Sequence, residues 1–317
     1  MKLVKIVFSV LVCIVLVAFV VIMSLNNWDF KALGGNFTHS EFEVSEDFDS
    51  IEINTVSADL VFLKSEDGKC KVVTYMNEKL SPSVTATEGK LVIDTVDLTK
   101  WYNRISLFSF DTPQITVYLP SEEYGALNID LSTGDTEIPV EFKFDALSIS
   151  ASTGDVQLSA AVKNTLKIDI TTGDIAISDT EVGALNLTST TGDITLCALK
   201  INGAADIKTG TGEIKLNRVN GENISVNGTT ADVELSDTVL SGKLDIDITT
   251  GDVSFDKSDA WEIKVVATTG DIKGTLLSEK IFLTDTTTGD VEVPKTVNGG
   301  SCSLATTTGD IEIYIEN

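Results

Sequence analysis

Apolar and polar residues alternate in short segments that recur every 19 or 20 residues from about residue 132 to the C-terminus. The repeat around Gly192 is typical of the series. Apolar Ile194 and Leu196 follow this glycine at two and four positions, and Leu185 and Leu187 precede it at seven and five positions. Polar residues stand between them. This period-2 alternation predicts two strands per repeat, each with one buried face.

A Thr-Gly-Asp tripeptide separates the two predicted strands in most repeats. No repeat can bury its own apolar columns, so we expect the repeats to stack and to share one core. The sequence therefore predicts an all-β fold, a β-helix (β-solenoid) of about 19–20 residues per coil. A sandwich built from hairpins would not require so constant a period. The repeated glycines are Gly134, Gly154, Gly173, Gly192, Gly212, Gly251, Gly270, Gly289 and Gly309.

The glycines are predicted to be structural, at a turn with positive φ or at a corner where a side chain would meet the neighbouring coil. The adjacent aspartate can accept hydrogen bonds from backbone amides. Two repeats depart from the pattern, with Glu213 in place of Asp and Ala231 in place of Gly.

A calcium site is the alternative interpretation of the acidic column, and no other cofactor is predicted. Carboxylates that stack about 4.8 Å apart repel one another, and calcium binds several carboxylate oxygens at once. The candidate metal ligands are Asp135, Asp155, Asp174, Asp193, Asp252, Asp271, Asp290 and Asp310.

A third interpretation is a threonine face that binds ice or another regular surface. Ile170 and Ile248 stand three positions before their glycines and are expected to face inward. By alternation, the threonine directly before each glycine is then expected to face inward or to form the corner. This expectation argues against a flat, exposed threonine surface.

The N-terminus predicts a membrane anchor. Residues 6–25 carry no charge, and this length is sufficient to span a bilayer. Lys2 and Lys5 precede the segment, so the positive-inside rule places the short N-terminal tail in the cytoplasm and the rest of the chain outside. We expect residues 1–25 to form one transmembrane helix that makes the membrane a partner, with a cleaved signal peptide as the alternative.

Three further regions follow the predicted anchor. Residues 26–40 are expected to form a stalk, 41–131 irregular N-terminal coils and a cap, and 132–317 the regular solenoid. Ala58 precedes Gly134 by four periods of 19 residues, so we expect the solenoid to begin near residue 45.

An aromatic excursion lies within residues 97–113. A solenoid must cover the exposed edge of its first coil, so a cap is the main interpretation and a binding patch is the alternative. The aromatic residues concerned are Trp101, Tyr102, Phe108 and Phe110.

Charge and cysteine content narrow the possible functions. The formal net charge is −25, which argues against a nucleic-acid partner. Four cysteines show no disulfide pattern, and Cys302 lies in an apolar column where a buried thiol is expected. The only histidine is His39, and no nucleophile elbow, zinc motif or P-loop is present, so we do not expect an enzyme.

The chain resembles a known bacterial family over roughly residues 40–317. The segment from Phe48 to Leu60 reads Phe-x-x-Ile-x-Ile-Asn-Thr-Val-Ser-Ala-Asp-Leu, residues 115–120 read Ile-Thr-Val-Tyr-Leu-Pro, and serial Thr-Thr-Gly-Asp repeats follow. These features resemble the bacterial putative-adhesin β-repeat family. The resemblance implies a right-handed β-helix outside the cell membrane and brings no catalytic motif.

Two functions remain open from the sequence. The first is a cell-surface, adhesin-like interaction module that binds an unidentified envelope polymer or protein. The alternative, which the resemblance also suggests, is an accessory regulator or sensor in cell-envelope stress signalling.

Overall fold

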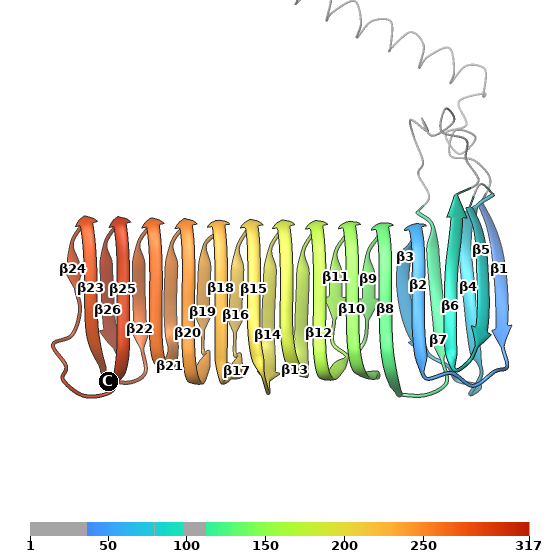
Figure 1. Cartoon of the computed structure of the whole chain (residues 1–317), viewed down its shortest axis with the longest axis horizontal. Coiled ribbons are helices and arrows are strands. Elements are labelled where there is room, and N and C mark those ends of the chain that lie inside the picture. Colours follow the sequence, from blue (N-terminus) through green and yellow to red (C-terminus); the bar gives the residue numbers. More distant parts are fainter. Residues whose placement is uncertain (1–36, 79, 98–111, 317) are drawn as a thin grey trace, which may run out of the picture.

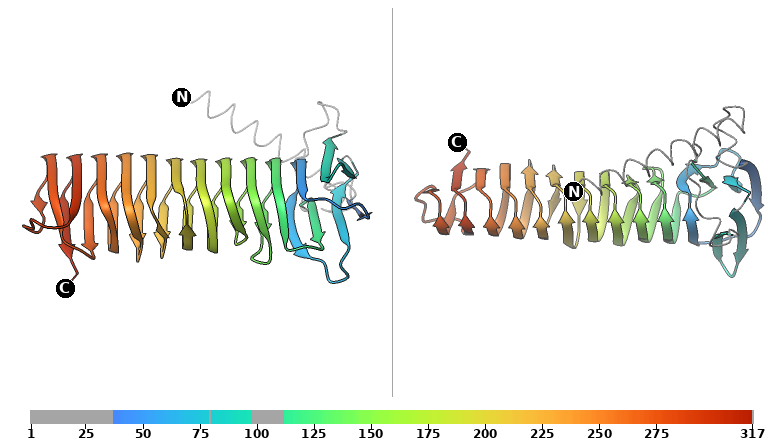
Figure 2. Two further views of the ribbon diagram at one scale, coloured as in Figure 1. Left: turned by 60° about the horizontal axis from the view of Figure 1, so that its bottom comes forward. Right: turned by 90° about the horizontal axis from the view of Figure 1, so that it is seen from above.

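The computed structural model describes residues 37–78, 80–97 and 112–316, and all regular elements in these ranges are β-strands (Figure 1). The chain winds into a rod of about ten turns, and further views show its strands stacked along one axis (Figure 2). The predicted all-β solenoid is therefore confirmed. The predicted anchor and the aromatic residues Trp101, Tyr102, Phe108 and Phe110 lie outside the described residues.

Hydropathy within the described ranges identifies no helix suited to crossing a membrane.

Two stacks of parallel strands form the body of the rod. The pre-glycine stack contains, in spatial order, β2 (Ser50–Ser57), β8 (Glu123–Thr133), β10 (Lys143–Thr153), β12 (Ala161–Thr172), β13 (Ile175–Thr191), β15 (Ala204–Thr211), β18 (Asn223–Thr230), β20 (Val239–Thr250), β21 (Val253–Thr269), β25 (Gly300–Thr308) and β23 (Lys280–Thr288).

The post-glycine stack is built in the same way from shorter strands. It contains β3 (Asp59–Lys64), β9 (Thr136–Ile138), β11 (Val156–Leu158), β13, β14 (Ile194–Ile201), β16 (Ile214–Asn217), β19 (Val233–Ser236), β21, β22 (Ile272–Leu276), β26 (Ile311–Ile315) and β24 (Val291–Glu292). The long strands β13 and β21 run through a corner and belong to both stacks, and β17 (Asn220–Gly221) pairs at this corner with β14 and β20.

The register places equivalent residues of successive coils side by side. Leu187 pairs with Ile168 on one side and Ile207 on the other, and Ile194 lies between Ile175 and Ile214 in the same way. All of these side chains are buried. Since each buried residue packs against its equivalents in both neighbouring coils, the core is continuous along the rod. Each fully buried Ile or Leu stabilises the fold by about 1.5–3 kcal/mol relative to exposure.

The C-terminal end departs from the order of the sequence. Strand β25 pairs with β21 on one side and with β23 on the other, so the last coil in the sequence is inserted between two earlier ones (Figure 1). Gly309 stacks on Gly270, and Gly289 is outermost. The expectation that each coil stacks on the next one in sequence is wrong here. The last coil supplies buried Leu304 where the earlier one has Thr284, so the more apolar coil occupies the inner place.

The N-terminal end is also built by chain that doubles back. Strand β2 lies between β8 and β6 (Lys90–Asp97), and β3 pairs with β7 (Gln114–Leu119). Ala58 therefore stacks directly on Gly134, and the Asp135 N–H donates to Asp59 Oδ1 at 3.0 Å. The interval between Ala58 and Gly134 does not consist of four stacked coils, as the sequence-based interpretation had it. Its residues form the end of the rod instead.

Antiparallel strands complete this end. β5 (Leu80–Thr87) pairs with β6, while β4 (Cys70–Asn77) joins β7 to β1 (Phe37–Val44). Since β1 begins at Phe37, residues 37–40 belong to a strand and not to a stalk, and the His39 ring lies against Tyr75 with centroids 4.7 Å apart. β5 contains Pro82, which an edge strand tolerates.

The threonines directly before the glycines are exposed at the corner, so of the two orientations expected from alternation the inward one is wrong. Ile170 is buried, whereas Thr171 and Thr172 are both exposed, and Thr249 and Thr250 repeat this pattern after buried Ile248. The strand bends as it reaches the corner, so strict alternation ends at the isoleucine. Two exposed hydroxyl columns follow from this bend.

Candidate functional site

The aspartate column forms a ladder of hydrogen bonds between coils. Asp174 Oδ1 accepts a hydrogen bond from the Asp193 N–H at 2.8 Å, and Asp155 Oδ1 accepts one from the Asp174 N–H at the same distance. The ladder continues through the inserted coil, where the Asp310 N–H donates to Asp271 Oδ1 at 2.8 Å. Each carboxylate thus satisfies a backbone donor at the corner of the neighbouring coil.

The ladder changes where the sequence departs from the repeat. The Glu213 N–H still donates to Asp193 Oδ1 at 2.7 Å. The Glu213 carboxylate pairs with Lys215 instead, with Nζ 2.8 Å from Oε2. The longer side chain therefore replaces a backbone contact with a surface ion pair.

The aspartates do not converge on a cation site. Among the described residues, no group of three or more His, Cys, Asp or Glu side chains has an arrangement that could hold a metal ion. One oxygen of each ladder carboxylate that has a further coil stacked beyond it is engaged by a backbone N–H where the next coil carries the repeat, as for Asp135 with Asp155 and Asp252 with Asp271. The ladder contacts give the acidic column a structural role at the turn.

Glycine is required in the column by both conformation and space. The column glycines have φ between 139° and 150°, which L side chains rarely adopt. A Cβ on Gly192 would lie 2.0 Å from the carbonyl oxygen of Gly173. The coils could not approach one another closely with any other residue in this backbone conformation.

Ala231 is accommodated by a second exception in the same coil. Its Cβ is buried, and Gly228 stands three positions earlier, where Ile170 and Ile248 occupy other coils. A Cβ on Gly228 would lie only 2.8 Å from the Ala231 Cβ. The missing side chain at 228 therefore provides the space that the extra methyl group at 231 fills.

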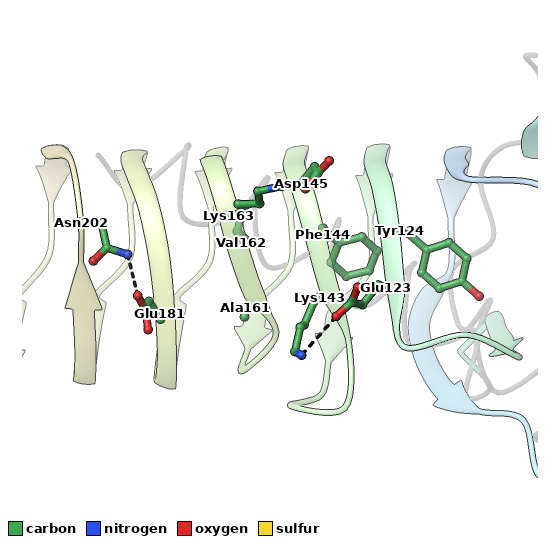
Figure 3. Close-up of a pocket in the computed structure, with 10 residues that line it drawn as sticks. All are labelled: Glu123, Tyr124, Lys143, Phe144, Asp145, Ala161, Val162, Lys163, Glu181 and Asn202. Carbon is green, nitrogen blue, oxygen red and sulfur yellow. Dashed lines mark hydrogen bonds and ion pairs between the residues drawn. The ribbon is translucent and has the colours of Figure 1, made fainter.

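A groove of about 340 Å³ runs along one corner of the rod, where the pre-glycine strands begin (Figure 3). It crosses successive coils from β8 to the end of β14, and we call it the corner groove. Its lining residues are Glu123, Tyr124, Lys143, Phe144, Asp145, Ala161, Val162, Lys163, Glu181 and Asn202.

Charged and amide side chains form the rim of the corner groove. Lys143 Nζ lies 3.3 Å from Glu123, and Lys163 Nζ lies 3.2 Å from Asp145. These four side chains are 53–75% exposed, so the pairs are weak and can exchange for contacts with a ligand.

One acid on the rim is held by two donors. Asn202 Nδ2 donates to Glu181 Oε1 at 2.7 Å, and Lys200 Nζ does so at 3.0 Å. The hydrogen bond from Asn202, and then that from Lys200, lower the pKa of Glu181. Glu181 is therefore an anionic hydrogen-bond acceptor on the rim.

Two aromatic rings form the floor of the corner groove. The rings of Tyr124 and Phe144 are stacked with centroids 6.1 Å apart, and both residues are at least 95% buried. The Tyr124 hydroxyl oxygen accepts a hydrogen bond from the Ser121 N–H at 3.1 Å, and burial raises its pKa. The floor is thus rigid, whereas the rim is polar and adaptable.

The corner groove could not be identified from the repeat. Its residues belong to the variable segment between the two predicted strands, and neither Lys163 nor Asn202 recurs at the same position in every coil. The sequence points to this corner only indirectly. Its residues vary from coil to coil while the apolar columns stay constant, and variable segments on a regular scaffold are where binding specificity can lie.

A family model matches nearly the whole described chain. The family described as Toastrack DUF4097 matches residues 48–210 and 204–317. No curated protein matches the chain.

Solved structures with a similar overall form come from Parabacteroides. A protein of Parabacteroides distasonis named a putative lipid binding protein has 17% sequence identity and a TM-score of 0.51, with 88% of this chain and 98% of that chain covered, which shows a shared fold. Proteins named putative adhesins from P. distasonis and P. merdae each have 13% identity, with TM-scores of 0.49 and 0.48. Each comparison covers 88% of this chain and 97% of the other.

Proposed function

The chain belongs to the Toastrack DUF4097 family, and we propose that it is a non-enzymatic surface interaction module that binds an extended envelope polymer along the corner groove. The observation that supports this proposal is the rim of the groove. Lysine, carboxylate and amide groups from successive coils line one continuous channel over a rigid aromatic floor.

The spacing of these groups suits a polymer more than a compact ligand. Neighbouring strands of a sheet are about 4.8 Å apart, so groups on successive coils present hydrogen-bonding partners at a regular interval. Lys163 supplies donors, whereas Glu181 accepts and Asn202 can do both. A glycan chain with hydroxyl and amide groups along its length has the matching chemistry.

The proposal includes the membrane placement expected from the sequence. Residues 6–25 would anchor the chain in the cell membrane with the N-terminal tail in the cytoplasm, and a right-handed solenoid would stand outside the cell. The net charge of −25 supports a soluble, self-repelling rod in that setting.

Binding to purified envelope glycan tests the groove. The full chain in nanodiscs is mixed with insoluble wall glycan and the bound fraction is measured after sedimentation. Lys163→Glu together with Asn202→Ala should reduce affinity about tenfold or more, since each lost contact costs about 1 kcal/mol. Lys264→Glu alters an exposed ion pair outside the corner groove and should bind normally. Equal binding by all three proteins would refute the groove as the site.

Replacing the anchor separates this proposal from a signalling role. An unrelated transmembrane helix in place of residues 6–25 should leave glycan binding intact. Loss of an envelope-stress response in cells that still bind glycan normally would instead favour the regulator.

A further inference from the structure

One lysine is buried beside a carboxylate at the C-terminal end of the rod. Lys280, the first residue of β23, is 2% exposed, and its Nζ lies 2.6 Å from Oδ1 of Asp259 in β21. Their side chains are 3% and 10% exposed, whereas every side chain in the other ion pairs of the described ranges is at least 29% exposed. This pair differs in kind from the surface pairs.

The two residues meet across a strand that lies between them. β25 is inserted between β21 and β23, and Gly300 stands opposite Lys280 in the register. A Cβ on Gly300 would lie 1.6 Å from the carbonyl oxygen of Trp261. Because position 300 carries no side chain, Lys280 and Asp259 can reach each other from coils that are not neighbours.

The charged groups of the pair each have one further hydrogen-bond partner. Lys280 Nζ also donates to Ser278 Oγ at 2.7 Å, and Asp259 Oδ1 accepts the Ala260 N–H at 2.8 Å. Cys302 shares this environment; it is 1% exposed, and burial raises the pKa of its thiol to about 12. Water is therefore largely excluded from the amine and the carboxylate.

We propose that Lys280 and Asp259 condense into an intramolecular isopeptide bond. Within the pair, the ammonium passes a proton to the carboxylate, which gives a neutral amine and a carboxylic acid. The nitrogen attacks Cγ, one C–N bond forms, and one C–O bond breaks. The hydroxyl leaves with a second amine proton as water, so no oxidant or other reactant is required. Ser278 accepts a hydrogen bond from the amine and is placed to relay this proton.

Burial favours the covalent product. A buried ion pair gains little net free energy, because desolvation of both charges opposes their attraction. An amide removes both charges and leaves a neutral group that costs less to bury. The bond would join β21 to β23 and hold the inserted C-terminal coil between them.

Peptide mapping of the full chain tests the proposal. Trypsin does not cleave after a lysine whose amine is acylated, so the bond predicts a branched product in which residues 258–264 are joined to residues 274–295, lighter than the sum of the two peptides by one water. Tandem mass spectrometry of protein purified from the membrane fraction would identify this product. The linear peptide 274–280 should be nearly absent.

Two arginine variants provide the comparison. Lys280→Arg keeps the charge and the trypsin site but should release linear 258–264 and 274–280 in full yield. Lys264→Arg changes an exposed partner of Asp245 and should retain the branched product. Recovery of linear 258–264 and 274–280 in full yield from the unmodified sequence would overturn the proposal and leave the pair ionic.

Discussion

Substitution of Gly192 by alanine tests the close contact between coils. Gly192 has φ of 142°, and a Cβ there would lie 2.0 Å from the Gly173 carbonyl oxygen, whereas ordinary van der Waals contact begins near 3.4 Å. The corner must therefore move by more than an ångström or change its backbone conformation. Either response disturbs the hydrogen bonds that join this coil to both of its neighbours.

The expected cost follows from these two effects. An L residue in such a φ region costs about 1–3 kcal/mol. The corner also contributes the Gly192 N–H to Thr211 O bond at 3.0 Å and the Asp193 N–H to Asp174 Oδ1 bond at 2.8 Å. At about 1 kcal/mol net for each bond, Gly192→Ala should lower the free energy of unfolding by about 3–5 kcal/mol.

Urea unfolding and hydrogen exchange provide the assay. In a stacked-repeat protein, stability is approximately a sum of terms between neighbouring coils, so exchange should accelerate most in the coils on either side of Gly192. Gly221→Ala is the matched control. Gly221 lies in the same part of the rod without positive φ, and a Cβ there would meet Ile201 atoms at 3.4 Å. It should change stability by less than about 1 kcal/mol.

Equal behaviour of the two variants would refute the reasoning. If Gly192→Ala unfolded at the same urea concentration as Gly221→Ala, the column glycines would not be required by contact between coils. Faster exchange spread evenly along the rod would contradict the local origin of the effect.

Three further predictions concern the core, the exceptional coil and the acidic ladder. Ile194→Asp places an unpaired charge at a fully buried position and should lower the free energy of unfolding by about 4 kcal/mol or more. Ile194→Val should lower it by only about 1 kcal/mol. Similar melting temperatures for the two variants would contradict the burial of the Ile194 column. Gly228→Ile should destabilise the protein by clashing with Ala231, and adding Ala231→Gly should recover stability in a double-mutant cycle, whereas additive losses would contradict the compensation. A hydrogen bond from Lys273, and then one from the backbone of Asp310, lower the pKa of Asp271, so its stabilising effect is present above the unfolded-state pKa and is lost as pH falls through the folded-state pKa. Asp271→Asn should therefore reduce the loss of melting temperature between about pH 5 and pH 3, and an unchanged pH dependence would contradict this role.

The regular part of the fold could be predicted because its physical requirements repeat. The column of Ile194 is buried and is apolar in almost every coil, with buried Thr136 as an exception, and the corner is glycine wherever φ lies near 140°. These constraints act on each coil separately, so they are visible in one sequence. The handedness of the solenoid is not fixed by them and stays a prediction.

The ends and the corner groove could not be predicted, because their physical requirements do not repeat from coil to coil. Gly289 and Gly309 share the Thr-Thr-Gly-Asp corner, so the repeat motif does not state which coil is inserted. The order depends on the packing of the other residues, such as buried Leu304 in the inserted coil and Thr284 in the outer one. Ala58 is separated from Gly134 by a whole number of periods by coincidence. The corner groove depends on which residues of unrelated identity, such as Tyr124 and Asn202, face one channel, and no periodic pattern specifies this.

The reversed order at both ends has a consequence for how such a rod can change in evolution. At each end of the rod, the chain first forms the outermost strands and then returns to form a coil nearer the middle. A repeat added at either terminus would interrupt this arrangement. A coil duplicated between Gly134 and Gly270 would meet only copies of its usual neighbours and would lengthen the rod by about 4.8 Å. The reach of the molecule can therefore be adjusted in single-coil steps from its middle while both ends keep their construction.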